Sequence, residues 1–295
     1  EKAGTDILSI IRRMDLPDDF SKTAARQARN LNKPVASEEI ARREDLRALP
    51  CITIDGADAK DLDDAVSLVM LKGGNCLLGV HIADVSHYVT PQSPLDQEAY
   101  KRGTSVYFPD RVLPMLPKEI SNGVCSLNPN TEKLTLSCIM ELDPAGKVVS
   151  HRLAETVIRT RYRMTYEDVN AMFDGDKGLL EQYKDIWPML SNMGALMEKL
   201  RNRRFKRGSM DFDLAEAKLI LDKKGHTVDV KLYERGISNQ MIEEFMLLAN
   251  ETVANHARQI GIPFLYRVHE TPDKEKLQQL NTFLHTLGYG CLLYT

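Results

Sequence analysis

The chain has 295 residues, of which 43% are hydrophobic, and its formal net charge at pH 7 is −3. This amount of apolar material is enough for one large domain or two small ones, so disorder is not the expected state of the chain. The longest strongly apolar stretches fall well short of the roughly 18 to 20 residues that cross a bilayer, which excludes a membrane span.

The five cysteines, at positions 51, 76, 125, 138 and 291, form no CxxC pair and have no neighbouring His at zinc-ligand spacing. We predict that they are reduced, mostly buried thiols. Such cysteine usage suits a reducing compartment, so we expect a cytoplasmic protein. We also expect a piece of a longer protein, because the chain opens on Glu1 and ends without a charged or polar tail.

Residues 1–49 are rich in charge and predict a lead-in segment with two short helices, at 22–30 and 37–46. Beyond Pro50 the pattern changes to strands. Three turn sequences predict hairpins: Lys72-Gly73-Gly74-Asn75, Asp143-Pro144-Ala145-Gly146 and Lys223-Lys224-Gly225. The strands are expected at 51–54, 65–71, 76–85, 133–142, 147–161, 218–221 and 227–232.

Long helices are predicted later in the chain, at 179–204, 239–260 and 273–287. Gly261 and Gly288 stand where two of these helices are expected to stop. Strands first and helices after indicate an α+β fold with an antiparallel, strand-rich first part. We therefore divide the chain into the lead-in segment, 1–49, and a main domain, 50–295.

The segment from Asp55 to Asp64 places five carboxylates within ten residues, directly after a predicted strand. Acidic runs are usually solvated loops. Here the apolar residues Ile54, Leu62 and Val66 are interleaved with the carboxylates, which predicts that some of them turn inward. Buried carboxylates need partners, and cations are the obvious ones.

The residue types of this segment limit which cation it binds. An EF-hand loop counted from Asp61 would need Gly and Glu where Val66 and Lys72 stand, so that calcium site is rejected. The cluster contains no His or Cys, and an all-oxygen site suits Mg²⁺ or Mn²⁺ better than zinc. Mg²⁺ held by carboxylates leaves positions for water and phosphate, which points to phosphodiester or nucleotide hydrolysis.

A net negative charge argues against simple nucleic-acid binding, but the charge is unevenly distributed. Six of the nine residues at 199–207 are Lys or Arg, and Arg152, Arg159, Arg161 and Arg163 form a second basic run. Basic walls around an acidic centre suit a polyanion that is held and cut. The first run also ends a predicted helix, where cations complement the dipole, so phosphate contact and a solvated helix end are equally supported.

The string at 53–65 resembles the signature of the ribonuclease II/ribonuclease R superfamily. Further segments follow in the order and spacing of that family and extend the resemblance over roughly 43–288. Their sequences are closer to those of the ribonuclease R branch. They are His81-Ile82-Ala83-Asp84-Val85-Ser86, Thr104-Ser105-Val106-Tyr107-Phe108-Pro109, Cys125-Ser126-Leu127-Asn128-Pro129, Arg207-Gly208-Ser209-Met210-Asp211-Phe212 and Tyr266-Arg267-Val268-His269-Glu270.

The resemblance implies an RNB-type catalytic domain of a processive 3′→5′ exoribonuclease that hydrolyses single-stranded RNA to nucleoside 5′-monophosphates. By the family pattern Asp55, Asp61 and Asp64 would hold Mg²⁺, with Mn²⁺ as the alternative ion. Asp63 would be the residue most directly needed for the chemical step. Two ions about 4 Å apart would activate water and stabilise the departing 3′ oxygen.

Two aromatic residues, Tyr107 and Phe212, match the positions where the family clamps bases near the 3′ end. Stacking tolerates any sequence because every base has a π face. For His81 and Asp84, a structural role and a site role are equally supported. RNA is thus the expected partner, and residues 1–49 would come from a preceding RNA-binding region.

The family's catalytic domain normally continues to a Ser-Pro-Ile-Arg-Arg-Tyr segment that this sequence does not contain. We therefore expect an incomplete domain with weak or no nuclease activity of its own. Two alternatives stay open. A pseudo-exonuclease would bind RNA without cutting it, and the intact aspartate set opposes that interpretation. A metal-dependent hydrolase of small nucleotides is favoured by the acidic net charge and opposed by the two aromatic positions.

Overall fold

The computed structural model describes residues 4–210, 217–222, 225–232 and 235–289. The chain divides into two compact units, residues 1–253 and residues 254–295, and the boundary falls within helix α9 (Ile237–Ile260). The second unit contains helix α10 (Lys274–Thr286), whose N-terminus is capped by the side chain of Asp273. The sheet, the two cores and the candidate site described below belong to the first unit.

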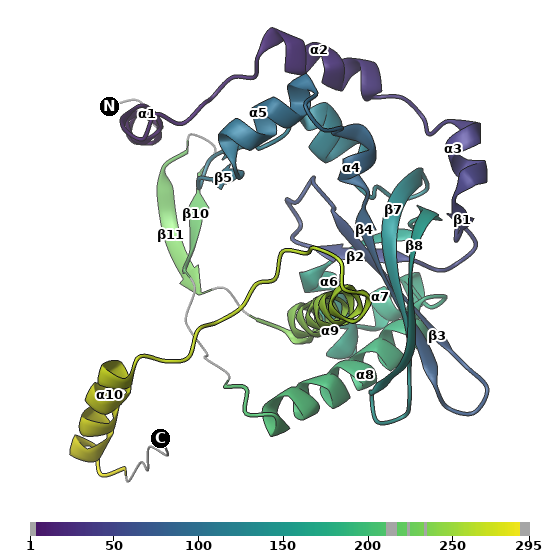
Figure 1. Ribbon diagram of the computed structural model, residues 1–295, viewed down its shortest axis with the longest axis vertical. Helices are drawn as coiled ribbons and strands as arrows, with labels where there is room; N and C mark the ends of the chain where they lie inside the picture. Colours follow the sequence, from purple (N-terminus) through teal and green to yellow (C-terminus); the bar gives the residue numbers. More distant parts are fainter. Residues whose placement is uncertain (1–3, 211–216, 223–224, 233–234, 290–295) are drawn as a thin grey trace. The chain divides into compact units, whose positions relative to one another are not determined.

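A seven-stranded sheet with the order β1-β8-β7-β4-β3-β2-β9 forms the centre of the first unit (Figure 1). Four neighbouring pairs are antiparallel, whereas β1 with β8 and β2 with β9 are parallel. The strands are β1 (Glu44–Asp45), β2 (Ile52–Asp55), β3 (Asp64–Met70), β4 (Cys76–Ala83), β7 (Glu132–Leu142), β8 (Val148–Arg159) and β9 (Tyr162–Thr165). Because β2 and β3 are antiparallel neighbours, the end of β2 and the start of β3 lie at the same end of the sheet.

The helices and the short hairpins complete this unit. The helices are α1 (Thr5–Arg13), α2 (Lys22–Leu31), α3 (Ser37–Arg42), α4 (Val85–Tyr88), α5 (Pro94–Arg102), the π-helix η1 (Glu119–Val124), α6 (Tyr166–Phe173), α7 (Lys177–Gln182) and α8 (Trp187–Lys206). The hairpins pair β5 (Val106–Tyr107) with β6 (Val112–Leu113), and β10 (Ala217–Leu221) with β11 (Thr227–Leu232).

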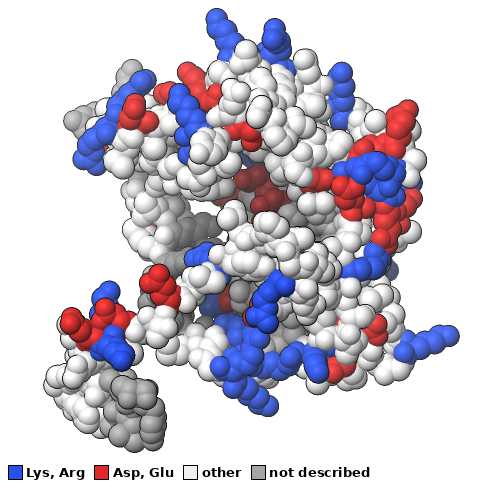
Figure 2. Space-filling view, in the orientation of Figure 1, with Lys and Arg blue, Asp and Glu red and all other residues white. Residues whose placement is uncertain are grey.

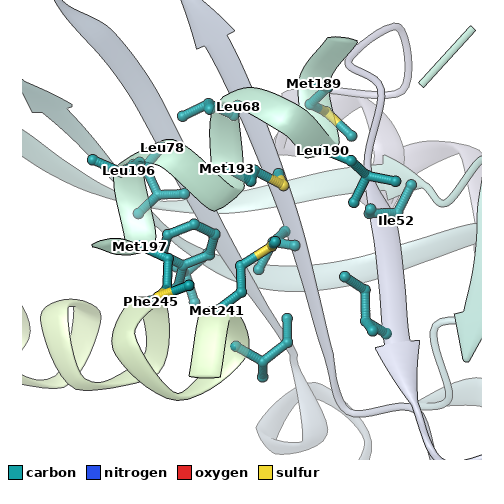
Figure 3. Packing of buried hydrophobic residues seen from close by; sticks show 14 of the residues in the cluster. Ile52, Leu68, Leu78, Met189, Leu190, Met193, Leu196, Met197, Met241 and Phe245 are labelled. Atoms are coloured by element: carbon teal, nitrogen blue, oxygen red, sulfur yellow. The ribbon is translucent and has the colours of Figure 1, made fainter. Parts of the chain in front are cut away.

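One face of the sheet is covered by α6, α8 and the first part of α9. Successive strand residues point to opposite faces, so Val66 and Leu68 enter this core while Ala65 enters the other. Apolar side chains of α8 recur at helical spacing and lie over the strands (Figure 3). They are Met189, Leu190, Met193, Leu196 and Met197, and they meet Met241 and Phe245 of α9 in the same core.

The opposite face carries a second core. Helix α2 packs against α5 and η1. This core contains Ala24, Ala28, Leu95 and Ile120, together with Leu62 from the acidic segment. Only 1% of Leu62 is exposed to solvent. Burial of this one side chain fixes the middle of a loop that is otherwise polar.

The predicted α+β class, with a strand-rich first part, is confirmed, and the three hairpins form at the expected places. Residues 223–224, in the turn of the third hairpin, lie outside the described residues. Cys51, Cys76, Cys125 and Cys138 are free and buried as predicted, and Cys291 lies outside the described residues. Gly261 and Gly288 have φ of 72° and 85°, the left-handed conformation expected where a helix stops. Within the described ranges, no helix is long and apolar enough to span a bilayer. The predicted boundary after residue 49 stays a prediction.

Three predicted elements were wrong in extent. The helix expected at 37–46 ends at Arg42, because Glu44 and Asp45 join the sheet as β1. The strand expected at 76–85 ends at Ala83, because Asp84 caps α4 with its side chain. The helix expected at 179–204 is two helices, α7 and α8, and the second begins with a proline in its first turn.

Candidate active site

Four aspartates of the acidic segment lie at one end of the sheet. Asp55 is the last residue of β2, Asp64 is the first of β3, and Asp61 and Asp63 belong to the connection between them. Their carboxylates are near enough to repel one another, as the pKa values below reflect. The structure thus brings together all four residues that were predicted from the sequence to act at a metal centre.

The backbone of this loop is held by residues distant in the sequence. The Leu62 amide donates to Oγ of Ser126 over 3.1 Å, and the same hydroxyl donates to the carbonyl of Lys60 over 2.9 Å. The Leu127 amide donates to the carbonyl of Leu62 at 2.7 Å. Ser126 is fully buried, so these bonds are shielded from competing water. The segment that contains Ser126 therefore serves as a support for the acidic loop.

Arg163 of β9 holds the other half of the loop. Its Nη2 donates to the carbonyls of Ala57 and Ala59, both at 2.8 Å. β9 lies directly beside β2, which places Arg163 opposite Thr53. The sequence predicted Arg163 only as part of a basic wall, whereas its guanidinium also bonds to the loop itself. A cavity of about 250 Å³ beside the loop is lined by Ala59, Lys60, Leu62, Asn122, Asn128 and Arg163.

The environment of the carboxylates opposes their ionisation. Burial raises the pKa of Asp64 to about 7, and repulsion from Asp55 and Asp63 adds to the shift. Burial also raises the pKa of Asp55 to about 6, with further repulsion from Asp63 and Asp61, while Arg163 acts in the opposite direction. The pKa of Asp63 is raised as well, first by burial. Perturbed carboxylates of this kind are typical of functional sites.

The donor chemistry fits a hard divalent cation. Among the described residues, Oδ2 of Asp55 and Oδ2 of Asp64 are buried without a hydrogen-bond partner. A cation would satisfy these oxygens and offset the repulsion between the carboxylates. Across the residues that the structure describes, no group of three His, Cys, Asp or Glu side chains is arranged to hold a metal ion. The structure therefore supplies oxygen ligands of the right kind without displaying a coordination geometry.

Tyr107 lies beside this group. Its hydroxyl donates to Oδ2 of Asp61 at 3.2 Å, and 66% of the residue is exposed to solvent. Its pKa is raised, first by partial burial and then by the negative charge of Asp61. An exposed ring whose edge is held next to a carboxylate has the form of a stacking platform for a base. Phe212, the second predicted clamp residue, lies outside the described residues.

His81 and Asp84 both have structural partners. The ring of His81 is fully buried, with Nε2 at 2.9 Å from Oγ of Ser67 and Nδ1 at 2.7 Å from Oγ of Ser137. Burial lowers the pKa of His81 to about 4, so the ring is neutral at pH 7. Asp84 forms an ion pair with Arg43 at 2.6 Å. The sequence does not reveal which residues contact His81 and Asp84, and these contacts distinguish a structural role from a site role.

Part of the basic run at 199–207 bonds to the protein itself. Arg204 pairs at 2.6 Å with Glu244, a residue only 4% exposed, and Arg207 pairs at 3.0 Å with Glu251. Arg203 donates to the carbonyl of Gly146. Figure 2 shows basic side chains gathered over the C-terminal part of α8, and acidic ones near the middle of the same face. Phosphate contact by this run stays a prediction.

A model of the RNB domain matches residues 43–290, which is most of the chain. The chain belongs to the RNB family. Ribonuclease R 1 of Lactococcus lactis subsp. lactis is 50% identical over 285 residues, and the match covers 97% of this chain and 35% of that protein. Ribonuclease R of Thermotoga maritima is 46% identical, with 96% and 40% covered. The RNB chain thus spans between a third and two fifths of the length of these curated relatives.

Solved structures give the same family. Mycoplasma genitalium RNase R in complex with ribose methylated single-stranded RNA has a TM-score of 0.89 and 29% identity to the RNB chain, and covers 98% of it. That alignment takes in 45% of the Mycoplasma chain. Yeast Ssd1, a pseudonuclease, has a TM-score of 0.71 at 19% identity and covers 89% of this chain and 32% of that one, a likeness that concerns the fold alone.

Proposed function

We propose that this RNB chain provides the hydrolytic centre of a processive 3′→5′ exoribonuclease that acts on single-stranded RNA and releases nucleoside 5′-monophosphates. The observation that carries the proposal is the loop between β2 and β3, where buried carboxylate oxygens without hydrogen-bond partners lie together. The names of the relatives and the RNA bound to the Mycoplasma protein support the choice of substrate.

Asp55, Asp61 and Asp64 are the proposed ligands of Mg²⁺, with Mn²⁺ as the alternative ion. When bound, such ions supply an activated water and stabilise the oxygen that departs from the scissile phosphate. Ser126 and Arg163 keep the loop backbone in place through their bonds to its amide and carbonyl groups. Asp63 is the proposed catalytic residue from the family pattern, and it lies directly before the proposed ligand Asp64.

The exposed ring of Tyr107 is the proposed stacking surface for a base near the 3′ end. Its hydrogen bond to Asp61 ties the position of the base to the position of the metal ligands. Such a link would place the terminal phosphodiester at the acidic loop whatever the identity of the base. Phe212 is proposed as the second stacking residue from the family pattern.

Asp63→Asn in the complete protein, of which this chain is expected to be a part, tests this function because it removes a charge and conserves size. We expect hydrolysis of a single-stranded oligonucleotide to fall by at least 100-fold, while RNA affinity stays within threefold of wild type. Asp58→Asn, at an exposed position of the same loop, is the matched control and should leave both unchanged. Undiminished hydrolysis by Asp63→Asn would refute the assigned mechanism. RNA binding without hydrolysis by the unaltered complete protein, despite bound Mg²⁺, would favour a pseudonuclease, and preference for mononucleotides would favour a small-nucleotide hydrolase.

A further inference from the structure

A buried ion pair connects the segment before the sheet to the end of β4. The Nη2 atom of Arg43 lies 2.6 Å from Oδ2 of Asp84, and the exposed fractions of the two side chains are 1% and 3%. Arg43 also donates through Nε to Oε1 of Glu39 at 2.6 Å, and its Nη1 lies 3.5 Å from the carbonyl oxygen of Thr135. One guanidinium thus joins α3, the end of β4 and β7.

The carboxylate of Asp84 is fully engaged. Besides Arg43, it accepts a hydrogen bond from the Ser86 hydroxyl at 2.7 Å and one from the His87 amide at 3.1 Å. Burial by itself would raise its pKa, but the hydrogen bond from Ser86 and the pairing with Arg43 outweigh that effect, so the pKa of Asp84 is lowered. Both members of the pair are therefore charged at neutral pH.

Burying two charges costs more free energy than burying apolar side chains of similar volume, so a buried pair is poor evidence for stability. Removing only one partner of such a pair is strongly destabilising, because it leaves an uncompensated charge in the interior.

The acidic loop is bonded through its backbone to the residue next to this ion pair. The amide of Ala83, the residue directly before Asp84, donates to the backbone carbonyl of Asp63 at 2.9 Å. The next backbone bond, from the Asp84 amide to the carbonyl of Leu134 at 2.9 Å, ties the same point to β7. A shift of Asp84 would therefore be passed through one peptide unit to Asp63.

We propose that Arg43, paired with Asp84, is a positioning residue for the acidic loop: it fixes the end of β4 and, through the Ala83 amide, the backbone of Asp63. The proposal rests on the proposed function only in taking this loop as the site of a divalent cation. Arg43 and Asp84 touch neither metal nor RNA in this role. Their effect is to hold the backbone from which the carboxylate of Asp63 projects, next to the proposed ligand Asp64.

The test measures the Kd for Mn²⁺ in the absence of RNA, by electron paramagnetic resonance titration of the protein. The values of kcat and KM for a single-stranded oligonucleotide are measured separately. Asp84→Asn conserves size and the acceptor for the His87 amide, but removes the charge. We expect its Kd for Mn²⁺ to rise at least tenfold and kcat to fall, with KM within twofold of wild type. The double variant with Arg43→Met and Asp84→Asn removes both buried charges. We expect this variant to recover the thermal stability of wild type without recovering its affinity for Mn²⁺.

Leu142→Ala is the control for simple destabilisation. Leu142 is fully buried and pairs with Cys76 at the opposite end of β4 from Ala83. Leu142→Ala should lower the unfolding temperature. At temperatures where this variant is folded, its Kd for Mn²⁺ should equal that of wild type. If Asp84→Asn does not fold, Arg43→Lys decides by the same criterion, with at least a threefold rise in Kd expected. Wild-type Mn²⁺ affinity in a folded Asp84→Asn, or recovery of that affinity in the double variant, overturns the proposal. Failure of the unaltered protein to bind Mn²⁺ overturns the proposed function instead.

Discussion

The hydroxyl of Tyr107 donates a hydrogen bond to Oδ2 of Asp61 across 3.2 Å, so an exposed aromatic ring and an acidic loop residue are directly coupled. The two residues lie 46 positions apart in the chain. The short hairpin β5–β6 carries the ring, and the connection between β2 and β3 carries the carboxylate. The contact separates two contributions of Tyr107 that substitutions can distinguish: stacking by the ring and restraint of Asp61 by the hydroxyl.

Tyr107→Phe keeps the ring and removes the hydrogen bond, whereas Tyr107→Ala removes both. We expect Tyr107→Ala to weaken binding of single-stranded RNA by roughly tenfold, the loss typical of one stacked base, about 1.4 kcal/mol. Tyr107→Phe should bind RNA within twofold of wild type and lower kcat, because Asp61 loses its restraint. Fluorescence anisotropy with a labelled oligonucleotide and single-turnover kinetics measure the two effects. Equal RNA affinities for Tyr107→Ala and wild type would contradict a stacking role.

The raised pKa of Asp64 predicts that the stability of the metal-free protein falls as the pH rises toward 7. Its pKa is about 7 in the folded chain, against an ordinary value of 3.8. Between about pH 4 and pH 7 the folded state therefore binds more protons than the unfolded state, and stability falls as the pH rises. At pH 7.5 in the presence of a chelator, Asp64→Asn should be more stable than wild type by roughly 1 to 3 kcal/mol.

Urea unfolding at pH 4.5 and pH 7.5 measures this difference. The gain from Asp64→Asn should shrink at pH 4.5, where Asp64 is protonated in the folded chain. Asp58→Asn, at an exposed position of the same loop, should show no such gain at either pH. Added Mg²⁺ should stabilise wild type and leave Asp64→Asn unaffected, because binding to the folded state alone raises its stability. A variant less stable than wild type at pH 7.5 without metal would contradict the sign of this effect.

The sequence predicted the acidic loop well because its chemistry is local. Five carboxylates within ten residues, flanked by apolar strand residues, predict a cluster in which some carboxylates turn inward, and Asp55 and Asp64 each have a buried oxygen. The hairpins were predictable for the same reason, since turn residues and strand alternation are short-range signals. The errors fall where a tertiary contact overrides a local pattern: Glu44 and Asp45 continue a helical pattern, yet they pair with Thr156 and Val157 of β8.

The supports of the loop were not predictable in this way. Arg43 meets Asp84 across 41 residues, and Ser126 meets Leu62 across 64. A single sequence contains no signal for such pairs, because the distance between two residues in the chain does not determine their distance in the fold. Arg163 was recognised as basic, but its bonds to the carbonyls of Ala57 and Ala59 depend on β9 lying next to β2, a parallel pairing absent from the predicted hairpins.

Gly79 makes room for the ring of His81. A Cβ atom at residue 79 would lie 2.5 Å from Oγ of Ser67 and 2.6 Å from Nε2 of His81. Gly79→Ala should therefore destabilise the protein by about 1 to 3 kcal/mol through overpacking. Chemical denaturation measures the cost. In a Ser67→Ala background one of the two clashes is gone, so the cost of Gly79→Ala should fall by at least about 0.5 kcal/mol. Strictly additive effects would show that the clash is relieved elsewhere.

The lowered pKa of His81 predicts that the folded protein loses stability in acid. The pKa of the buried ring is about 4, whereas the ordinary value is 6.5. Between these values the unfolded chain binds a proton that the folded chain does not, so stability falls as the pH drops below 6.5. From pH 7 to pH 5 the contribution of this one residue is roughly 2 kcal/mol.

His81→Asn isolates this contribution, because Asn retains polar atoms for Ser67 and Ser137 and carries no titratable group. The variant is expected to be less stable than wild type at pH 7, where two well-formed hydrogen bonds are disturbed. Its loss of stability between pH 7 and pH 5 should be smaller than that of wild type by about 2 kcal/mol. All other titrating groups are shared, so the difference between the two urea-unfolding profiles reports His81 alone. Parallel profiles for His81→Asn and wild type would mean that the ring is protonated in the folded chain.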